Sequence, residues 1–360
     1  TYDVNGAEET QYRAETFNPS RIDLVGHTVH LQPNASVRAA GGEITVKAVK
    51  DPSKPTYKDA SKPRNDSRVV LETGASISAA GSAAVAVEGS RNQITADLFG
   101  VQLADSPLQR SGILYRKTVN YDLRRGIKVA NTTDYEKLVP ITVGERTAAG
   151  GKVSIQSEGD ILIAMGAGID ISGGWLAYQP TTLLNTYLYS ERKRYDISDA
   201  PANVVYTRME TEERSLAGYV EGKDAGSVTL NGASLVLDGT VKGGVRIGDY
   251  QRESGINTPI GGQLILGDAS GGGRTEDPSY RLPKTEIRGV VDSFVPDAGQ
   301  TWLNTGLSDR GTTTLLSADL FAHGVSRFAL YSNGAIDQKV AIDVGASTGG
   351  FTELLLRRGA

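Results

Sequence analysis

The sequence predicts an all-β fold, a parallel β-helix in which short strands stack in the successive turns of a solenoid. Three observations predict it. The chain is rich in glycine, with 43 residues, and poor in aromatic residues, at 6%. Two short patterns alternate along the chain at a spacing of roughly 20 residues, the length of one solenoid turn. Each copy places an apolar side chain on every second residue, the period of a half-buried strand.

The first pattern is a pair of glycines followed by an alternating strand. Glycine adopts backbone conformations that other residues avoid, so it is favoured where a turn leads into a strand. Copies lie at residues 41–46, 150–155 and 261–266, with a close relative at 243–247 and a looser one at 226–230.

The second pattern is a turn of small residues that leads into another alternating strand. Copies lie at residues 34–39, 74–79, 166–171 and 232–237. The most complete solenoid turn spans residues 150–174. There six apolar residues all fall on odd-numbered positions: Val153, Ile155, Ile161, Ile163, Ile169 and Ile171. We expect these six side chains to point inward. A β-sandwich of short strands is the alternative, but the recurrence of one template favours the solenoid.

Three segments interrupt the pattern and are expected to be loop insertions: residues 51–66, 175–222 and 249–310. The second is rich in tyrosine, a residue that gives contact area and a hydroxyl at low entropic cost. The candidate residues for contact with a partner are Tyr178, Tyr187, Tyr189 and Tyr195. Packing of these rings within the protein is the equal alternative.

Composition excludes several classes of function. Basic and acidic residues, 38 and 42, are mixed along the chain and leave a net charge of −4, so nucleic acid is not an expected partner. The absence of cysteine excludes disulfides and thiolate metal sites. We find no apolar run of the roughly 18 residues that a membrane span requires, and no apolar leader. We therefore expect an interior segment of a longer protein.

Metal and catalytic sites are not expected. His27 and His30 would lie on one strand, residues 25–31, with His27 inward and His30 outward, so they cannot share an ion. The candidate carboxylates for a polysaccharide lyase or hydrolase are Asp160, Asp170, Asp196 and Asp238. Most of them occupy turn positions, where aspartate is favoured because it bonds to the local backbone. The sequence therefore predicts a protein that is not an enzyme, with β-helix lyase or hydrolase activity as the alternative.

Residues 159–174 resemble the repeats of filamentous haemagglutinin-family exoproteins, and residues 103–114 resemble a segment of the large members of that family. The resemblance extends from about residue 20 to about residue 335 along the printed sequence. It implies a right-handed β-helix over residues 1–336, secreted or held at the cell surface by way of an outer-membrane two-partner transporter. It also implies an adhesin that contacts a host or bacterial surface glycan or protein. The amino-terminal secretion signature of the family is not seen, since residues 18–20 read Asn-Pro-Ser.

The last residues, 337–360, break the solenoid pattern. They read as a buried strand, a glycine-rich turn and an amphipathic helix, the first unit of a doubly wound fold. This stretch resembles the cofactor loop of haemolysin A-type and FtsJ-like ribosomal RNA methyltransferases. That resemblance implies that S-adenosylmethionine would be lined by Asp343, Gly345, Ser347 and Gly349. One strand and one helix are too few to hold a cofactor, so we expect no cofactor and an incomplete domain. A truncated methyltransferase fusion is the further alternative.

Overall fold

The computed structural model describes residues 11–53, 65–191, 193–254, 258–267, 282–332, 335–338 and 354–358. These residues are mainly β-strands, many of them in parallel sheets, which confirms the all-β prediction at that level. The chain divides into two compact units. The first unit contains Thr1–Phe17, Val85–Arg146 and Leu176–Val220, and the second contains Asn18–Ala84, Thr147–Trp175 and Glu221–Ala360.

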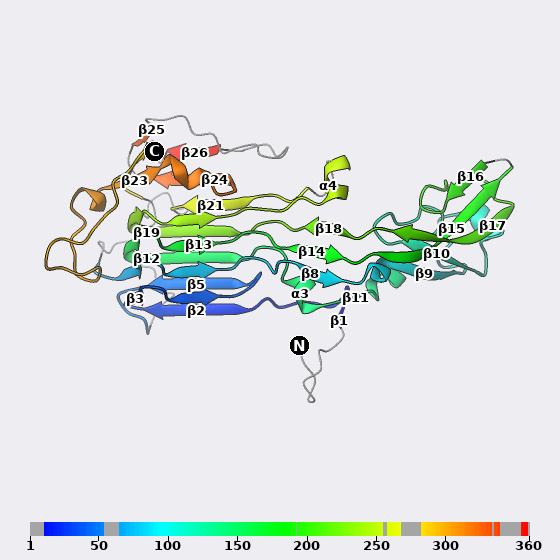
Figure 1. Ribbon diagram of the computed structural model, residues 1–360, viewed down its shortest axis with the longest axis horizontal. Helices are drawn as coiled ribbons and strands as arrows, with labels where there is room; N and C mark the ends of the chain where they lie inside the picture. The colour runs from blue at the N-terminus through cyan, green and yellow to red at the C-terminus, as the bar shows by residue number, and fades with distance from the viewer. Residues whose placement is uncertain are drawn as a thin grey trace, which may run out of the picture. The chain divides into compact units, whose positions relative to one another are not determined.

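The second unit is built on one large parallel sheet with the strand order β2-β5-β12-β19-β21-β24-β26. Strand β6 pairs with both β3 and β12 beside this path. Figure 1 shows β2, β5, β12, β19 and β21 lying one above another in the order in which the chain forms them. The bounds are β2 Arg21–Gly26, β3 Thr28–Leu31, β5 Glu43–Ala48, β6 Arg68–Leu71, β12 Lys152–Ile163, β19 Ser227–Leu237, β21 Gly262–Leu266, β24 Val325–Ser332 and β26 Leu354–Arg358.

Two smaller parallel sheets belong to the same unit. One has the order β4-β7-β13-β20, with β4 Ser36–Arg38, β7 Ser76–Ser78, β13 Gly168–Asp170 and β20 Thr240–Lys242. The other has the order β23-β22-β25, with β22 Lys284–Arg288, β23 Thr313–Ser317 and β25 Ile336–Gln338. The helical segments of this unit are α4 Asp249–Ser254, η3 Ser308–Gly311 and η4 Ala318–Phe321.

Strand register places like side chains over like and forms the core. One column runs through register partners on six neighbouring strands: Ile22, Ile44, Val153, Val228, Leu264 and Phe328. From Ile44 onward each of these side chains is at most 2% exposed. In the smaller sheet, Val37, Ile77, Ile169 and Val241 align in the same way. The six inward residues predicted for 150–174 are all buried.

Close approach of neighbouring backbones explains the glycine pairs. A Cβ atom added to Gly151 would lie 1.9 Å from the carbonyl oxygen of Gly42, and one added to Gly226 would lie 1.8 Å from that of Gly151. No side chain fits there. At the corner that precedes β4, β7 and β13, Asn34, Gly74 and Gly166 all have positive φ. Glycine and asparagine are the residues that most readily adopt this conformation.

The first unit consists mainly of antiparallel sheets. Strands β9 and β10 pair with each other, β16-β15-β17 form a three-stranded sheet, and β1 pairs with β11. Strands β8, β14 and β18 form a further sheet, in which β8 and β14 are parallel. The bounds are β1 Gln11–Tyr12, β8 Val85–Val87, β9 Gln93–Leu98, β10 Lys117–Asp122, β11 Pro140–Ile141, β14 Trp175–Tyr178, β15 Thr181–Ser190, β16 Lys193–Asp196, β17 Arg208–Leu216 and β18 Tyr219–Gly222, with η1 Gly89–Asn92, α1 Pro107–Arg110, α2 Thr133–Lys137 and α3 Val143–Arg146.

This unit has its own core, which includes Leu98, Leu103, Leu114, Tyr121 and Leu188, all fully buried. Residues 175–222, expected to be a loop insertion, contribute five strands. Residues 85–146, which the sequence patterns did not separate from the predicted solenoid, belong to the same unit. Within them, residues 103–114 form turns and α1.

The third predicted insertion also contains regular strands. Residues 249–310 contain α4, β21 and β22. They also contain most of a long segment without strands, residues 289–311, which ends in η3 and which we call the outer loop. The outer loop packs Phe294, Trp302 and Leu307 onto Val70, Leu162 and Val236 of the large sheet. Of the insertion at 51–66, residues 54–64 lie outside the described ones.

The end of the chain corrects one prediction. Leu354–Arg358 forms strand β26, which pairs in parallel with β24, so the amphipathic helix expected there is wrong. Three leucines followed by two arginines are too short a run to distinguish the period of a helix from that of a strand. Pairing with β24 makes this segment a strand. None of the helices in the described residues has the length and apolar character needed to cross a membrane.

Candidate functional site

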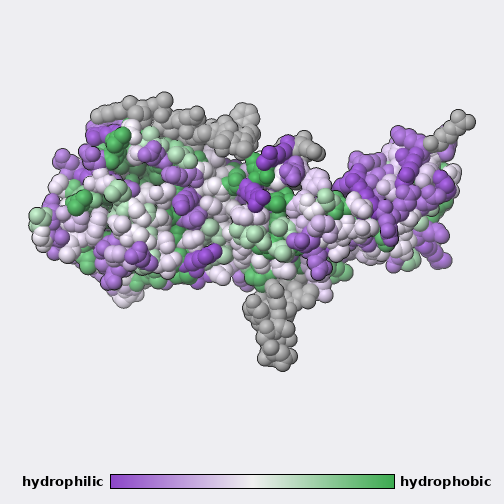
Figure 2. All heavy atoms as spheres, in the orientation of Figure 1, coloured by the Kyte–Doolittle hydropathy of each residue, from purple (hydrophilic) through white to green (hydrophobic). Residues whose placement is uncertain are grey.

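The three-stranded sheet β16-β15-β17 carries a polar face that we call the tyrosine face. Side chains alternate along a strand, so Tyr187 and Tyr189 share one side of β15. Their register partners on β17 are Glu210 and Arg208, and Arg194 of β16 lies opposite Tyr189. The other side of β15 carries Leu188, which is fully buried. Figure 2 shows hydrophilic residues gathered over the part of the chain that Figure 1 labels β15–β17.

Both tyrosine rings of this face already have intramolecular partners. The guanidinium carbon of Arg194 lies 3.7 Å from the ring centroid of Tyr187, and that of Arg208 lies 3.8 Å from the centroid of Tyr189. The Tyr189 hydroxyl donates a 2.7 Å hydrogen bond to Glu210 Oε2. That bond to a carboxylate raises the pKa of Tyr189. The tyrosine face therefore offers ring edges, guanidinium groups and carboxylates rather than open ring faces.

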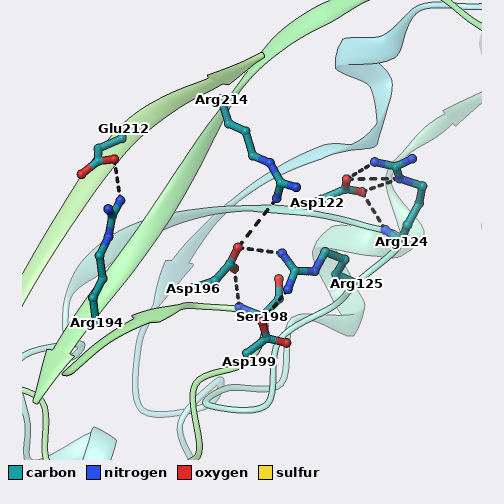
Figure 3. A network of polar contacts seen from close by, with 9 residues as sticks. All are labelled: Asp122, Arg124, Arg125, Arg194, Asp196, Ser198, Asp199, Glu212 and Arg214. Carbon is teal, nitrogen blue, oxygen red and sulfur yellow. Dashed lines mark hydrogen bonds and ion pairs between the residues drawn. The ribbon is translucent and has the colours of Figure 1, made fainter. Parts of the chain in front are cut away.

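Ion pairs extend from this sheet to the turn after β10 (Figure 3). Asp196 Oδ2 lies 2.6 Å from Arg125 Nη1 and 3.8 Å from Arg214 Nη1. Arg125 also pairs with Asp199 at 2.5 Å, and Arg194 pairs with Glu212 at the same distance. Charges of both signs thus lie close together on this surface. A solvent-exposed ion pair such as Arg194 with Glu212 contributes little to the stability of the fold.

Tyr178 and Tyr195 do not join the tyrosine face. Tyr178 is only 6% exposed, stacks on Tyr219 with ring centroids 4.3 Å apart, and its hydroxyl accepts a 2.9 Å hydrogen bond from Arg91. Tyr195 is the register partner of Leu188 on the core side of the sheet. Its ring meets the edge of Tyr206 at 5.8 Å. Of the four candidate tyrosines, only Tyr187 and Tyr189 lie on one surface.

The four candidate aspartates all have local partners. Asp160 pairs with Arg68 and Asp238 with Arg310, each at 2.7 Å, and both carboxylates are 5% exposed. Asp170 Oδ1 accepts a hydrogen bond from the Ser172 backbone N–H at 2.9 Å. Asp196 belongs to the network of Figure 3. These contacts favour structural roles for the four carboxylates.

The two neighbouring histidines also have carboxylate partners. The strand expected at 25–31 is interrupted, because His27 separates β2 from β3. Its side chain is 42% exposed rather than inward and lies 3.2 Å from Asp66 Oδ1. His30 Nε2 lies 2.6 Å from Glu72 Oε1 on the neighbouring segment. Among the described residues, no three His, Cys, Asp or Glu side chains converge as metal ligands.

The residues implied for S-adenosylmethionine, Asp343, Gly345, Ser347 and Gly349, lie outside the described residues. Sequence reasoning missed Arg194 and Arg208 as partners of the two tyrosines. The sequence signal for them is the run of charged residues along β16 and β17, and this run does not identify the partners of the tyrosines until the strand register is known.

Comparisons with known proteins identify no relative. No protein-family model, curated protein or solved structure matches the chain.

Proposed function

We propose that the chain is part of a right-handed β-solenoid in a secreted adhesin or exoprotein of the filamentous haemagglutinin type, exported by an outer-membrane two-partner transporter. The observation that carries the proposal is the core column from Ile22 to Phe328. Strands that stack in parallel, in chain order and with like residues aligned, are the defining feature of solenoid architectures.

Pairing of the smaller sheet supports the same architecture. Strands β7, β13 and β20 follow β6, β12 and β19 along the chain and pair in the same order. The passages through β6 and β7, β12 and β13, and β19 and β20 therefore each extend both sheets. This is how a solenoid buries a continuous apolar interior while its corners remain free to carry insertions.

The tyrosine face is the proposed contact surface for a host or bacterial surface glycan or protein. Tyrosine and arginine are enriched in protein interfaces, and charged groups of both signs select a complementary partner. The local partners of Asp160, Asp170, Asp196 and Asp238 favour this adhesive function over a polysaccharide lyase or hydrolase.

A binding experiment tests the proposal. The full chain is immobilised on beads and offered to bacterial and host cells and to a glycan array, beside a Tyr187→Ala/Tyr189→Ala variant. The matched control is Tyr12→Ala/Tyr115→Ala, because both of those tyrosines are exposed in the same unit, at 40% and 41%. We expect the wild type and the control to adhere, and the first variant to bind at least about tenfold more weakly, the equivalent of about 1.4 kcal/mol.

Two results would contradict this account. Equal binding by Tyr187→Ala/Tyr189→Ala removes the tyrosine face from the proposal. A wild-type chain that adheres to no surface removes the adhesive function itself. Circular dichroism spectra of the three proteins confirm that loss of binding is not loss of fold.

A further inference from the structure

A second surface of the first unit has the features of a ligand site. An open hollow of about 510 Å³ lies between the start of β9 and the segment that joins α2 to β11. We call it the β9 hollow. One wall carries Glu88, Ser90 and Gln93, and the other carries Tyr135, Leu138 and Pro140. The volume falls within the range of roughly 300–1,000 Å³ that is typical of small-molecule sites.

Hydrogen bonds fix the frame of the β9 hollow. Arg91 Nη2 lies 2.5 Å from Glu145 Oε1, and Arg91 Nη1 donates to the carbonyl oxygen of Pro140 at 3.3 Å. Across the hollow, the Tyr135 hydroxyl donates to the carbonyl oxygen of Asp97 at 3.1 Å. A site whose walls are held before the ligand arrives loses less conformational entropy on binding.

The polar wall keeps unused hydrogen-bonding groups. Within the part of the chain that the structure describes, the Glu88 carboxylate and the Ser90 hydroxyl have no side-chain partner, and both residues are exposed. Gln93 accepts a 2.8 Å hydrogen bond from the Leu184 N–H through Oε1, which leaves its NH₂ group to donate. The lining of the hollow thus includes both hydrogen-bond acceptors and a donor.

The opposite wall is apolar and open to solvent. Leu138 is 63% exposed although it is a large aliphatic residue. Pro140 is exposed beside it, and Tyr135 is half-buried. Small-molecule sites combine an apolar lining with a few polar groups that fix the orientation of the ligand.

We propose that the β9 hollow binds a neutral or amino sugar at the end of a glycan. The C–H face of a pyranose ring packs on Leu138 and Pro140, and its hydroxyl groups bond to Glu88, Ser90 and Gln93. Charge selects the class of sugar. The cation of Arg91 is already paired with Glu145, so the carboxylate of Glu88 is the uncompensated charge of the polar wall and disfavours sialic, uronic and sulfated sugars.

This inference rests on the proposed adhesive function, because a surface adhesin is the kind of protein that encounters glycans. The β9 hollow is, however, a separate surface from the tyrosine face. Its test uses free sugars as well as glycans. Saturation-transfer NMR with the full chain measures binding of methyl glycosides of neutral, amino and acidic sugars. The variants are Glu88→Ala and Leu138→Ala, both at exposed positions, and the control is Tyr115→Ala, at an exposed tyrosine of the same unit that does not line the hollow.

We expect neutral or amino glycosides to bind and acidic ones not to bind. Each hollow variant should weaken binding by about tenfold, as loss of a hydrogen bond to a charged group or of apolar contact does, and the control should bind as the wild type. Failure of every neutral and amino glycoside to bind, equal binding by both hollow variants, or preference for acidic sugars would overturn the assignment. If cells adhere equally to the hollow variants and to the wild type, the adhesive function does not depend on the β9 hollow. If the chain binds glycosides but adheres to no cell, the β9 hollow is a sugar site and the adhesive function is wrong.

Discussion

Arg68 and Asp160 form a nearly buried ion pair that links two strands to the outer loop. Arg68 Nη2 lies 2.7 Å from Asp160 Oδ2, and the two side chains are 12% and 5% exposed. The other terminal nitrogen of Arg68 donates to the carbonyl oxygens of Trp302 and Thr305 at 2.9 and 3.1 Å. One guanidinium therefore holds β6, β12 and the outer loop together.

Loss of one partner of this pair should destabilise the protein strongly. Asp160→Ala leaves the Arg68 cation buried without its carboxylate, and such an uncompensated charge costs about 3–5 kcal/mol. Urea denaturation followed by tryptophan fluorescence measures the change; the chain has two tryptophans, Trp175 and Trp302. The double variant Arg68→Met/Asp160→Leu should recover most of the loss, because it removes both charges. Equal stability of Asp160→Ala and the wild type contradicts the buried-pair account.

Glycine pairs give the sharpest local prediction. Gly151→Ala forces a Cβ atom against the carbonyl oxygen of Gly42, a backbone atom that cannot move without disturbing the sheet. We expect a loss of about 1–3 kcal/mol or more and a lower Tm by calorimetry. Gly168→Ala is the control, because a Cβ atom there meets nothing within 4 Å. Equal Tm values for the two variants would show that β5 and β12 are not in close contact at this point.

Burial of Tyr206 predicts sensitivity to alkali. Burial raises the pKa of this tyrosine from 10.0 to about 12, and its hydroxyl donates a 2.7 Å hydrogen bond to the Pro201 carbonyl. Because the folded pKa is above the unfolded one, the neutral ring stabilises the fold below pH 10, and that contribution is lost as the pH rises toward 12. Tyr206→Phe should therefore lose less stability between these pH values in alkaline denaturation followed by circular dichroism. A parallel loss in both proteins refutes the prediction.

The charged groups of the tyrosine face should matter little for folding. Arg194→Gln removes the pair with Glu212, whose side chains are 43% and 47% exposed. Exposed pairs contribute roughly 0–1 kcal/mol, so the urea midpoint should shift only slightly. A much larger loss would indicate that the guanidinium over Tyr187 is essential to the sheet. That result would favour a structural role for the tyrosine face over partner contact.

The comparison of sequence with structure shows where pattern reasoning succeeds. Alternation around Val153 and Ile155 predicted their burial, and the paired glycines marked the starts of β5, β12 and β21. These features repeat, and each is set by contacts with a similar residue on the neighbouring strand. Period and composition are enough to find them.

Features without a repeat were missed. The unit formed with residues 85–146 uses antiparallel pairs such as β9 with β10, whose partners no periodicity indicates. The tyrosine composition of 175–222 singled out Tyr178, but stacking on Tyr219 buries it, and only the strand register shows this. The β9 hollow likewise depends on Glu88 and Leu138 meeting across a gap of about fifty positions in the printed sequence.

The central claim is that successive passages of the chain stack in parallel and in register, and engineered cysteines test it most directly. The native chain has no cysteine, so a Thr45→Cys/Ser154→Cys variant contains only the designed pair. Thr45 and Ser154 are register partners on β5 and β12, about 4.8 Å apart as neighbouring strands are, within the Cα range of a disulfide. Thr45→Cys/Gln156→Cys is offset by two residues, which puts the Cα atoms about 8 Å apart, beyond that range. Mild oxidation followed by a count of free thiols should show a disulfide in the register pair and free thiols in the offset pair. A disulfide in the offset pair, or free thiols in the register pair, would contradict the stacked arrangement and the proposals built on it.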